Sequence, residues 1–269
     1  MCADASLRVR ALLDLVLPVT CAGCGARSVA ACRRCLAPLL AAPTPAWPRP
    51  SPPGLPPPFA VAAYEGSVRA LLLAVKEEGI AALQRPLGQA LARSVATAAR
   101  AAPAPVRLVP VPSSTTARRR RGEDVVRRMA AVAAAELRCA GWDAAVVPVL
   151  RHGRSVTDSA GLGAQDRARN LAGAFTVGAG RADRLGGATV VLVDDLITTG
   201  ATLSECAAAL SRAGVRTLAC ATVAATQRRS PAGSAQAARR ALPSQGQVMQ
   251  PTEGIPRGRR REGSPHRSR

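Results

Sequence analysis

The sequence predicts an α/β domain with a mostly parallel β-sheet flanked by helices. Short apolar runs alternate with stretches of helical character from residue 59 to residue 226, and this alternation favours a parallel sheet with helices on both faces. In addition, the apolar run at 189–193 leads into a polar loop and then into a helix-forming stretch. Ligands of open α/β sheets bind where strands end in such loops.

Each predicted element corresponds to its own stretch of sequence. We expect strands where short apolar runs occur, at 59–64, 107–111, 145–150, 189–193 and 217–223. We expect helices at 7–17, 67–78, 87–102, 122–140 and 202–213. Gly214 follows the last of these helices and is a typical stop signal, because glycine readily adopts the left-handed conformation that ends many helices.

The composition limits both the core and the partners. Only five of the 269 residues are aromatic, so the core must be built from Leu, Val and Ala. The net charge is +20, and the basic residues are arginines apart from Lys76. Arginine presents a planar fork that suits phosphate and carboxylate oxygens. Anion binding is one interpretation, and an arginine-rich composition without a binding role is the other.

Composition also divides the chain into four parts. Residues 43–58 hold nine prolines, which exclude a helix or a central strand and predict a semi-rigid linker. We therefore expect an N-terminal helix and cysteine-rich knot at 1–42 and the α/β domain at 59–226. Residues 227–269 carry ten arginines against two glutamates and few large apolar side chains, so we expect a disordered basic tail there.

No stretch of the sequence predicts a membrane span. The longest apolar run near the start, 11–19, is interrupted by Asp14 and is shorter than the roughly 20 residues that a span needs. It also fits poorly with the charged start and clean apolar run of a secretory signal. We therefore expect a cytoplasmic protein, in whose reducing environment cysteines are interpreted first as metal ligands.

Two Cys-x-x-Cys pairs lie in the N-terminal part. Cys21 and Cys24 form the first pair, and Cys32 and Cys35 form the second. Each pair can present two thiolates from one tight turn, and four thiolates complete a tetrahedral Zn²⁺ site with no open position. We expect a structural zinc site, with free or redox-active thiol pairs as the alternative.

The most informative segment runs from Val190 to Thr202. Two carboxylates end an apolar strand, and a loop of Thr, Thr, Gly, Ala and Thr then opens a helix. The N-terminus of a helix offers free backbone N–H groups and the positive end of the helix dipole, which favour an anion. The carboxylates would accept hydrogen bonds from ribose hydroxyls and help to hold Mg²⁺. The alternative is a strand end followed by an ordinary helix cap. The predicted phosphoribose site comprises Asp194, Asp195, Thr198, Thr199, Gly200, Ala201 and Thr202.

This segment resembles the phosphoribosyl pyrophosphate signature of type I phosphoribosyltransferases. Three other segments add to the resemblance: Tyr64–Arg69 with Lys76 and Gly79, Leu108–Ser113 with the arginine run 118–121, and Arg167–Phe175. Together with the cysteine knot, and in this order, they resemble the ComF family over roughly residues 7–226. Proteins of that family are associated with competence and contain a phosphoribosyltransferase-like domain.

The resemblance implies roles for further residues. Arg120, within the arginine run, would lie at a mobile loop and stabilise charge on departing pyrophosphate; a solvated basic surface is the alternative. Arg169 and Asn170 would either bind the ligand or tie elements together near the site. Where the family often has an aromatic residue and an amide, this sequence has Glu123 and Asp124. The loop that holds pyrophosphate would comprise Val109, Pro110, Val111 and Ser113.

Two functions remain compatible with these residues. The first is an enzyme that binds phosphoribosyl pyrophosphate with Mg²⁺ and transfers phosphoribose to a nitrogenous acceptor, and we favour this interpretation slightly. The second is a non-enzymatic accessory protein of DNA uptake. It would bind single-stranded DNA through arginines and the zinc knot, work beside other DNA-uptake proteins, and use the phosphoribose site as a sensor. No base-specific pattern identifies the acceptor.

Overall fold

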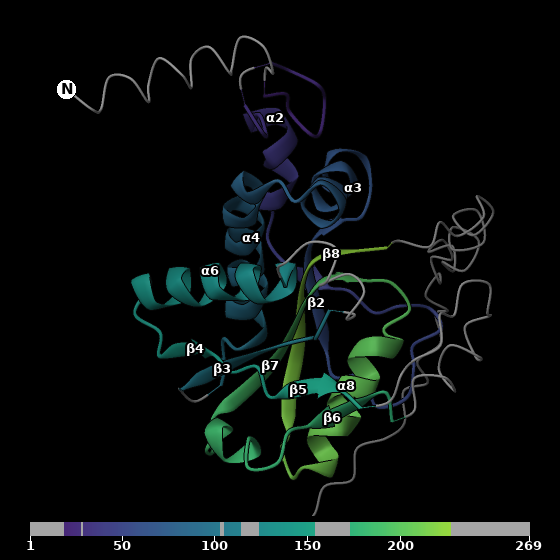
Figure 1. Cartoon of the computed structure of the whole chain (residues 1–269), viewed down its shortest axis with the longest axis vertical. Helices are drawn as coiled ribbons and strands as arrows, with labels where there is room; N and C mark the ends of the chain where they lie inside the picture. The colour runs from purple at the N-terminus through teal and green to yellow at the C-terminus, as the bar shows by residue number, and fades with distance from the viewer. Residues whose placement is uncertain (1–18, 28, 103–104, 114–123, 154–172, 227–269) are drawn as a thin grey trace, which may run out of the picture. The chain divides into compact units, whose positions relative to one another are not determined.

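A computed structural model of the chain describes residues 19–27, 29–102, 105–113, 124–153 and 173–226. Its centre is a six-stranded sheet with the order β1-β2-β8-β7-β3-β4 (Figure 1). The neighbouring pairs from β2 to β4 are parallel, and β1 is antiparallel to β2. The predicted mostly parallel α/β sheet is therefore confirmed.

The bounds of the elements follow the predicted alternation. The strands are β1 (Thr44–Pro45), β2 (Pro58–Ala63), β3 (Val106–Pro110), β4 (Ala144–Val146), β5 (Leu150–His152), β6 (Phe175–Val177), β7 (Thr189–Ile197) and β8 (Thr217–Ala225). The α-helices are α2 (Arg33–Leu36), α3 (Gly66–Leu73), α4 (Gln84–Ala98), α6 (Val125–Cys139) and α8 (Ala201–Arg212). Shorter helical turns are η1 (Ala37–Leu40), η2 (Ala74–Glu78), η3 (Ala81–Leu83) and η4 (Ala182–Leu185).

The sheet is buried on both faces by separate apolar clusters. Successive side chains of a strand point to opposite faces, and β7 shows this directly. Val191 and Val193 pack with residues of α3, α4 and α6, whereas Val190 and Leu192 pack with residues of α8. Because both faces of β7 are covered, its sequence is a continuous apolar run rather than an alternating one.

Two predicted strands differ in the structure. The run expected as one strand at 145–150 is divided: β4 ends at Val146 in the main sheet, and β5 begins at Leu150 and pairs with β6 in a separate two-stranded sheet. Pro148 lies between them and has no N–H with which to continue a ladder. The strand expected at 189–193 extends to Ile197, because β8 continues to pair with it as far as Ala225.

The proline-rich segment 43–58 contributes an edge strand and packs onto the domain. Its short strand β1 lies at the edge of the sheet, where a missing N–H is tolerated. Leu55 is buried in the same apolar cluster as residues of α8, and Pro53 O accepts a 2.6 Å hydrogen bond from Ser204 Oγ. The division of the chain at residues 42, 58 and 226 stays a prediction, since these contacts do not test independent folding.

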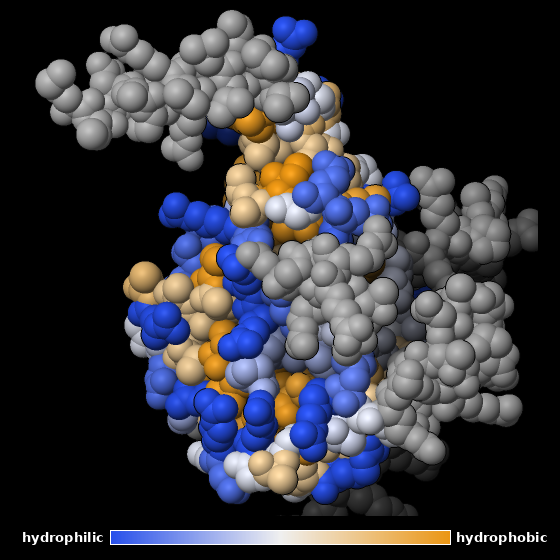
Figure 2. Space-filling view, in the orientation of Figure 1, coloured by the Kyte–Doolittle hydropathy of each residue, from blue (hydrophilic) through white to orange (hydrophobic). Residues whose placement is uncertain are grey.

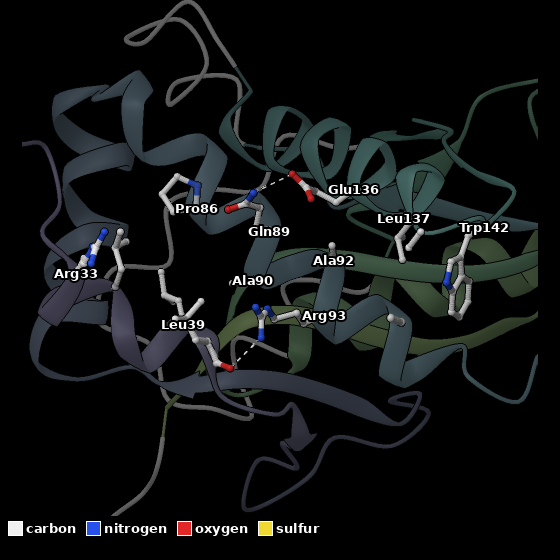
Figure 3. A pocket seen from close by; sticks show the side chains of 14 residues that line it. Arg33, Leu39, Pro86, Gln89, Ala90, Ala92, Arg93, Glu136, Leu137 and Trp142 are labelled. Carbon is white, nitrogen blue, oxygen red and sulfur yellow. Dashed lines mark hydrogen bonds between the residues drawn. The ribbon is translucent and has the colours of Figure 1, made fainter.

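The surface combines hydrophilic residues with smaller hydrophobic areas on the face seen in Figure 2. A cavity of about 620 Å³ lies between α2–η1, α4 and α6 (Figure 3). Leucines and Trp142 line it, together with a hydrogen-bonded pair, Gln89 and Glu136. None of the predicted phosphoribose residues is among its lining. Among the described residues, no helix is long and apolar enough to cross a membrane.

Candidate phosphoribose site and cysteine knot

The loop between β7 and α8 has the form expected of an anion site. Gly200 is the N-cap residue of α8 and has φ +74°, a conformation that glycine adopts without strain. Ala201 N donates to Thr199 Oγ1 at 3.4 Å. Thr198 is exposed, and Thr199, Ala201 and Thr202 are half-buried. The first N–H groups of a helix have no partner within the helix, and such groups favour an anion.

Gly200 also lies against the proline-rich segment. A Cβ atom at this position would lie 3.0 Å from Leu55 Cδ2 and 3.1 Å from Pro48 Cγ. Both residues are buried. The segment therefore limits how far the loop can move away from the sheet. The sequence did not predict this contact between the segment and the loop.

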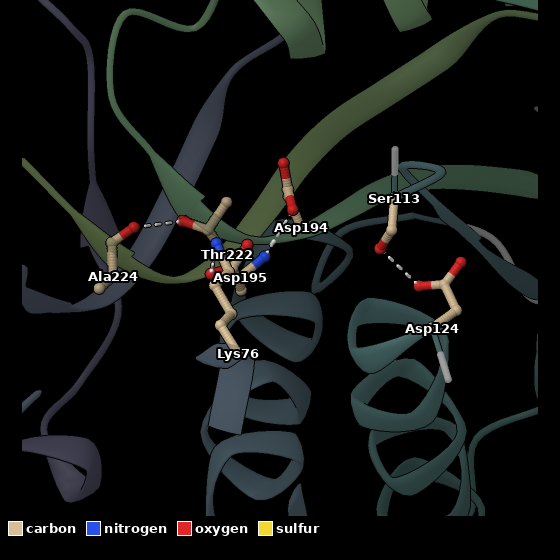
Figure 4. Close-up of polar contacts among 7 residues, drawn as sticks. All are labelled: Lys76, Ser113, Asp124, Asp194, Asp195, Thr222 and Ala224. Atoms are coloured by element: carbon tan, nitrogen blue, oxygen red, sulfur yellow. Dashed lines mark hydrogen bonds and ion pairs between the residues drawn. The ribbon is translucent and has the colours of Figure 1, made fainter. Parts of the chain in front are cut away.

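Asp194 and Asp195 lie within β7 rather than after it, and they point to opposite faces of the sheet (Figure 4). Asp194 is half-buried, and its Oδ1 accepts a 2.8 Å hydrogen bond from Asp195 N. Burial and the neighbouring Asp195 carboxylate raise the pKa of Asp194 well above its usual value. A carboxylate in this setting is stabilised by an added cation, which fits a role in holding Mg²⁺.

Asp195 forms an ion pair with Lys76 that the sequence analysis did not predict. Lys76 Nζ lies 2.5 Å from Asp195 Oδ2, and the carboxylate is only 4% exposed (Figure 4). Burial lowers the pKa of Lys76, but the charge of Asp195, the hydrogen bond to it and the charges of Asp194 and Tyr64 together outweigh this effect, and the pKa is raised. The ammonium group is therefore charged and offsets the negative charge of the buried Asp195. In the sequence, Lys76 stood out as the only lysine and as part of a segment that resembles the ComF family.

The end of β3 lies beside the carboxylates. Val109 pairs with Leu192, and Pro110 pairs with Val193. Val111 N continues this alignment by donating to Val193 O at 2.9 Å. The side chains of Val109 and Val111 are buried in the core, so only backbone groups of these two residues could face a ligand.

Ser113 is held on two sides. Its Oγ donates a 3.0 Å hydrogen bond to Asp124 Oδ1 (Figure 4), and its carbonyl oxygen lies 3.1 Å from His152 Nε2. His152 in turn packs against Phe175, with ring centroids 5.1 Å apart. His152 thus has a structural contact next to the predicted pyrophosphate loop. The predicted site residues Arg120, Arg169 and Asn170 lie outside the described residues.

The four cysteines of the N-terminal knot come together as predicted. The Sγ atoms of Cys21, Cys24, Cys32 and Cys35 all lie within 4.8 Å of one another. Cys24 Sγ and Cys32 Sγ are 3.7 Å apart, close to the roughly 3.8 Å edge of a tetrahedron with Zn–S bonds of about 2.3 Å. Four thiolates could not share this space without a cation, because like charges disfavour ionisation. The cluster therefore fits a closed structural zinc site.

The thiols of the knot have unequal acidities in the absence of a metal. Burial raises the pKa of Cys21, but hydrogen bonds from the backbone of Cys32, Gly23 and Cys24 outweigh it and lower the pKa to about 6. Burial and the three neighbouring thiols raise the pKa of Cys35 to about 12. Cys206 and Cys220 are fully buried, as expected of small core residues.

Comparison with known proteins supports the interpretation of the α/β domain. Residues 120–246 match the family model described as the phosphoribosyl transferase domain. The match includes Asp194, Asp195 and the loop that opens α8, and it supports a type I phosphoribosyltransferase-like protein. It begins after β3 and the cysteine knot. A search of curated proteins found no match.

Proposed function

We propose that this protein binds phosphoribosyl pyrophosphate with Mg²⁺ at the carboxyl ends of β3 and β7. The observation that carries the proposal is the convergence of three features at one edge of the sheet. These are the carboxylates of Asp194 and Asp195, the helix N-terminus at 198–202, and the β3 end that follows Val109.

Each feature has a separate role toward the donor. The backbone N–H groups at 198–202 would bind the 5′-phosphate, because the helix dipole and free donors favour an anion. Asp194 would accept hydrogen bonds from the ribose hydroxyls, and Asp195, paired with Lys76 on the opposite face of the sheet, would act through its neighbour Asp194. The end of β3, from Val109 to Ser113, would lie against the pyrophosphate. Mg²⁺ would neutralise pyrophosphate charge when bound, and the oxygens of Asp194 suit this hard cation.

We further propose that the bound phosphoribose is transferred to a nitrogenous acceptor. In such a reaction a C–N bond forms at the anomeric carbon of the ribose while the C–O bond to pyrophosphate breaks. The protein contributes by fixing the donor and by stabilising the departing charge. The domain match to phosphoribosyl transferases supports this reaction class.

The motif order supports a more specific proposal, membership of the ComF family. The cysteine knot, the Lys76 segment, the β3 loop and the β7 loop occur in the order of that family. A role in DNA uptake would then be expected. Binding of single-stranded DNA to the full chain should weaken steeply with salt, because it depends on phosphate contacts. Salt-insensitive or absent binding would contradict this role.

The first experiment is calorimetric titration of phosphoribosyl pyrophosphate into the full-length protein, with and without Mg²⁺. We expect binding that requires Mg²⁺ and is lost in an Asp194→Asn/Asp195→Asn double variant. Asp143→Asn is a matched control, because Asp143 is an exposed carboxylate paired with Arg107. If the double variant binds like the wild type, the site assignment is wrong. Pyrophosphate release on addition of nitrogenous bases then tests for transfer.

A further inference from the structure

We propose that the cysteine knot positions Lys76, and that Lys76 is a positioning residue of the phosphoribose site acting through Asp195. The inference rests on the proposed function for its effect on ligand affinity. It connects two parts of the chain that the sequence analysis treated as separate units. Three consecutive sets of contacts carry it, from the knot to helix α3, along α3–η2, and from Lys76 to Asp195.

The first set of contacts joins the knot to the start of α3. Ser67 Oγ donates a 3.0 Å hydrogen bond to Cys35 O. Gly23 lies against the same two residues, since a Cβ atom there would lie 2.6 Å from Cys35 Sγ and 3.2 Å from Ser67 Cβ. The turn between the first pair of cysteines is thus packed between a thiol of the second pair and helix α3. Opening the knot would remove this support from Ser67.

The second step is the helix that runs from Ser67 to Lys76. Helix α3 continues directly into the π-helical turn η2, which ends at Glu78 and is capped by Gly79 with φ +70°. Leu71 and Val75 are fully buried in the core. Their packing anchors α3 and η2 to the same core, so we expect a displacement of α3 to displace η2 as well. A π-turn contains more residues than an α-turn, and such turns are frequent at functional sites. Here the turn carries Lys76.

The third contact is the ion pair with Asp195. A buried carboxylate that loses its cationic partner becomes costly to keep ionised. Without Lys76, the Asp195 carboxylate would lose the partner that fixes its position, and its backbone N–H, which donates to Asp194 Oδ1, would pass that displacement to Asp194. The side chain of Lys76 is 35% exposed, and its backbone lies in η2, which continues α3. A shift of α3 at its Ser67 end would therefore change the charge environment of both carboxylates.

The first test asks whether the cysteine knot stabilises the helix that carries Lys76. Hydrogen exchange is measured in zinc-loaded and metal-depleted full-length protein. Metal removal should increase exchange in 66–78, while α8 keeps its protection. Unchanged exchange in 66–78, or equal loss throughout the domain, would overturn the proposal. Hydrogen exchange needs no ligand, so it tests the link between the knot and residues 66–78 by itself. Absence of phosphoribosyl pyrophosphate binding to the wild type would instead refute the proposed function.

Variants that keep the metal test the effect on the site. Ser67→Ala retains all four thiols and should bind zinc like the wild type, yet bind phosphoribosyl pyrophosphate about threefold more weakly, of the order of one lost hydrogen bond. Lys76→Gln should weaken binding about tenfold, because it removes a charge from a buried pair. Arg69→Ala is the control, since Arg69 is exposed on the same helix.

The double variant decides whether Ser67 acts through Lys76. If it does, Ser67→Ala should cause little further loss of affinity in the Lys76→Gln background, because residues of one network are not additive. Independent, additive effects of the two substitutions would overturn the proposed route, as would an Arg69→Ala variant that weakens binding as much as Ser67→Ala.

Discussion

Ser113 Oγ donates a 3.0 Å hydrogen bond to Asp124 Oδ1 and thereby connects the end of β3 to the start of α6. The same Asp124 oxygen accepts a hydrogen bond from Arg127 N at 3.2 Å, which makes Asp124 the N-cap of α6. One carboxylate thus stabilises a helix and restrains the predicted pyrophosphate loop.

Replacing Asp124 should affect both properties. Asp124→Ala should lower the free energy of unfolding by about 1 kcal/mol, as expected for loss of an N-cap, and should also weaken binding of phosphoribosyl pyrophosphate. Asp124→Asn keeps an oxygen acceptor at the same place and should resemble the wild type. Denaturant unfolding and calorimetry measure the two effects. Weaker stability with unchanged ligand affinity would show that Ser113 does not depend on Asp124.

Asp124 also illustrates what the sequence could and could not predict. The alternation of strands and helices could be predicted, because local apolar runs determine it. The arrangement of β7, its loop and α8 could be predicted from one continuous segment. The Ser113–Asp124 and Lys76–Asp195 contacts could not be predicted from the sequence. They depend on how α6 and α3 pack against the sheet, and in the sequence their residues are 11 and 119 positions apart. Asp124 was noted in the sequence only as a departure from a family pattern.

The proline-rich segment shows a second limit of sequence-based prediction. Its prolines excluded a helix or a central strand, and the edge strand β1 agrees with that exclusion. Its contact with the loop at Gly200 involves Leu55 together with Pro48 and Pro52. No periodic pattern surrounds Leu55, so its burial could not be derived from the sequence.

Substitution of Gly200 should disturb the loop between β7 and α8. Gly200→Ala would place a methyl group 3.0 Å from Leu55 Cδ2 on a residue with φ +74°, which combines backbone strain with close packing. We expect a loss of about 1–3 kcal/mol in the free energy of unfolding and weaker ligand binding. Gly214→Ala is the control for backbone strain alone, because Gly214 has φ +75° and a Cβ atom there would have no neighbour within 4 Å. Equal losses in both variants would exclude a role for the contact with Leu55.

If the four-cysteine cluster binds zinc, substitution of different cysteines should change the zinc content differently. Cys24→Ser removes one of four thiolates from the cluster, so metal analysis should find much less zinc in this variant than in the wild type, in which we expect one zinc per chain. Cys139→Ser is the matched control, because Cys139 is exposed and lies outside the cluster. A wild-type protein purified without zinc, or a Cys24→Ser variant with full zinc content, would contradict the assignment.

Asp194 should make stability depend on pH in a direction opposite to that of most carboxylates. Burial and Asp195 raise its pKa in the folded protein well above the usual 3.8, so the fold favours the protonated form. This contribution to stability is complete below the unfolded pKa and is lost as the pH rises through the higher pKa of the folded state. Ionisation of Asp194 therefore becomes a growing cost to the ligand-free fold as the pH rises.

The variant Asp194→Asn removes this pH-dependent loss. It should have nearly wild-type stability at acidic pH and should exceed the wild type increasingly as the pH rises, while its Mg²⁺-dependent ligand binding is lost. Urea unfolding across the pH range measures the difference, and Asp143→Asn should show no such trend because Asp143 is exposed. If Asp194→Asn is less stable than the wild type at alkaline pH, the carboxylate contributes to the ligand-free fold. The ionised Asp194 carboxylate would then need no Mg²⁺ to offset an unfavourable charge.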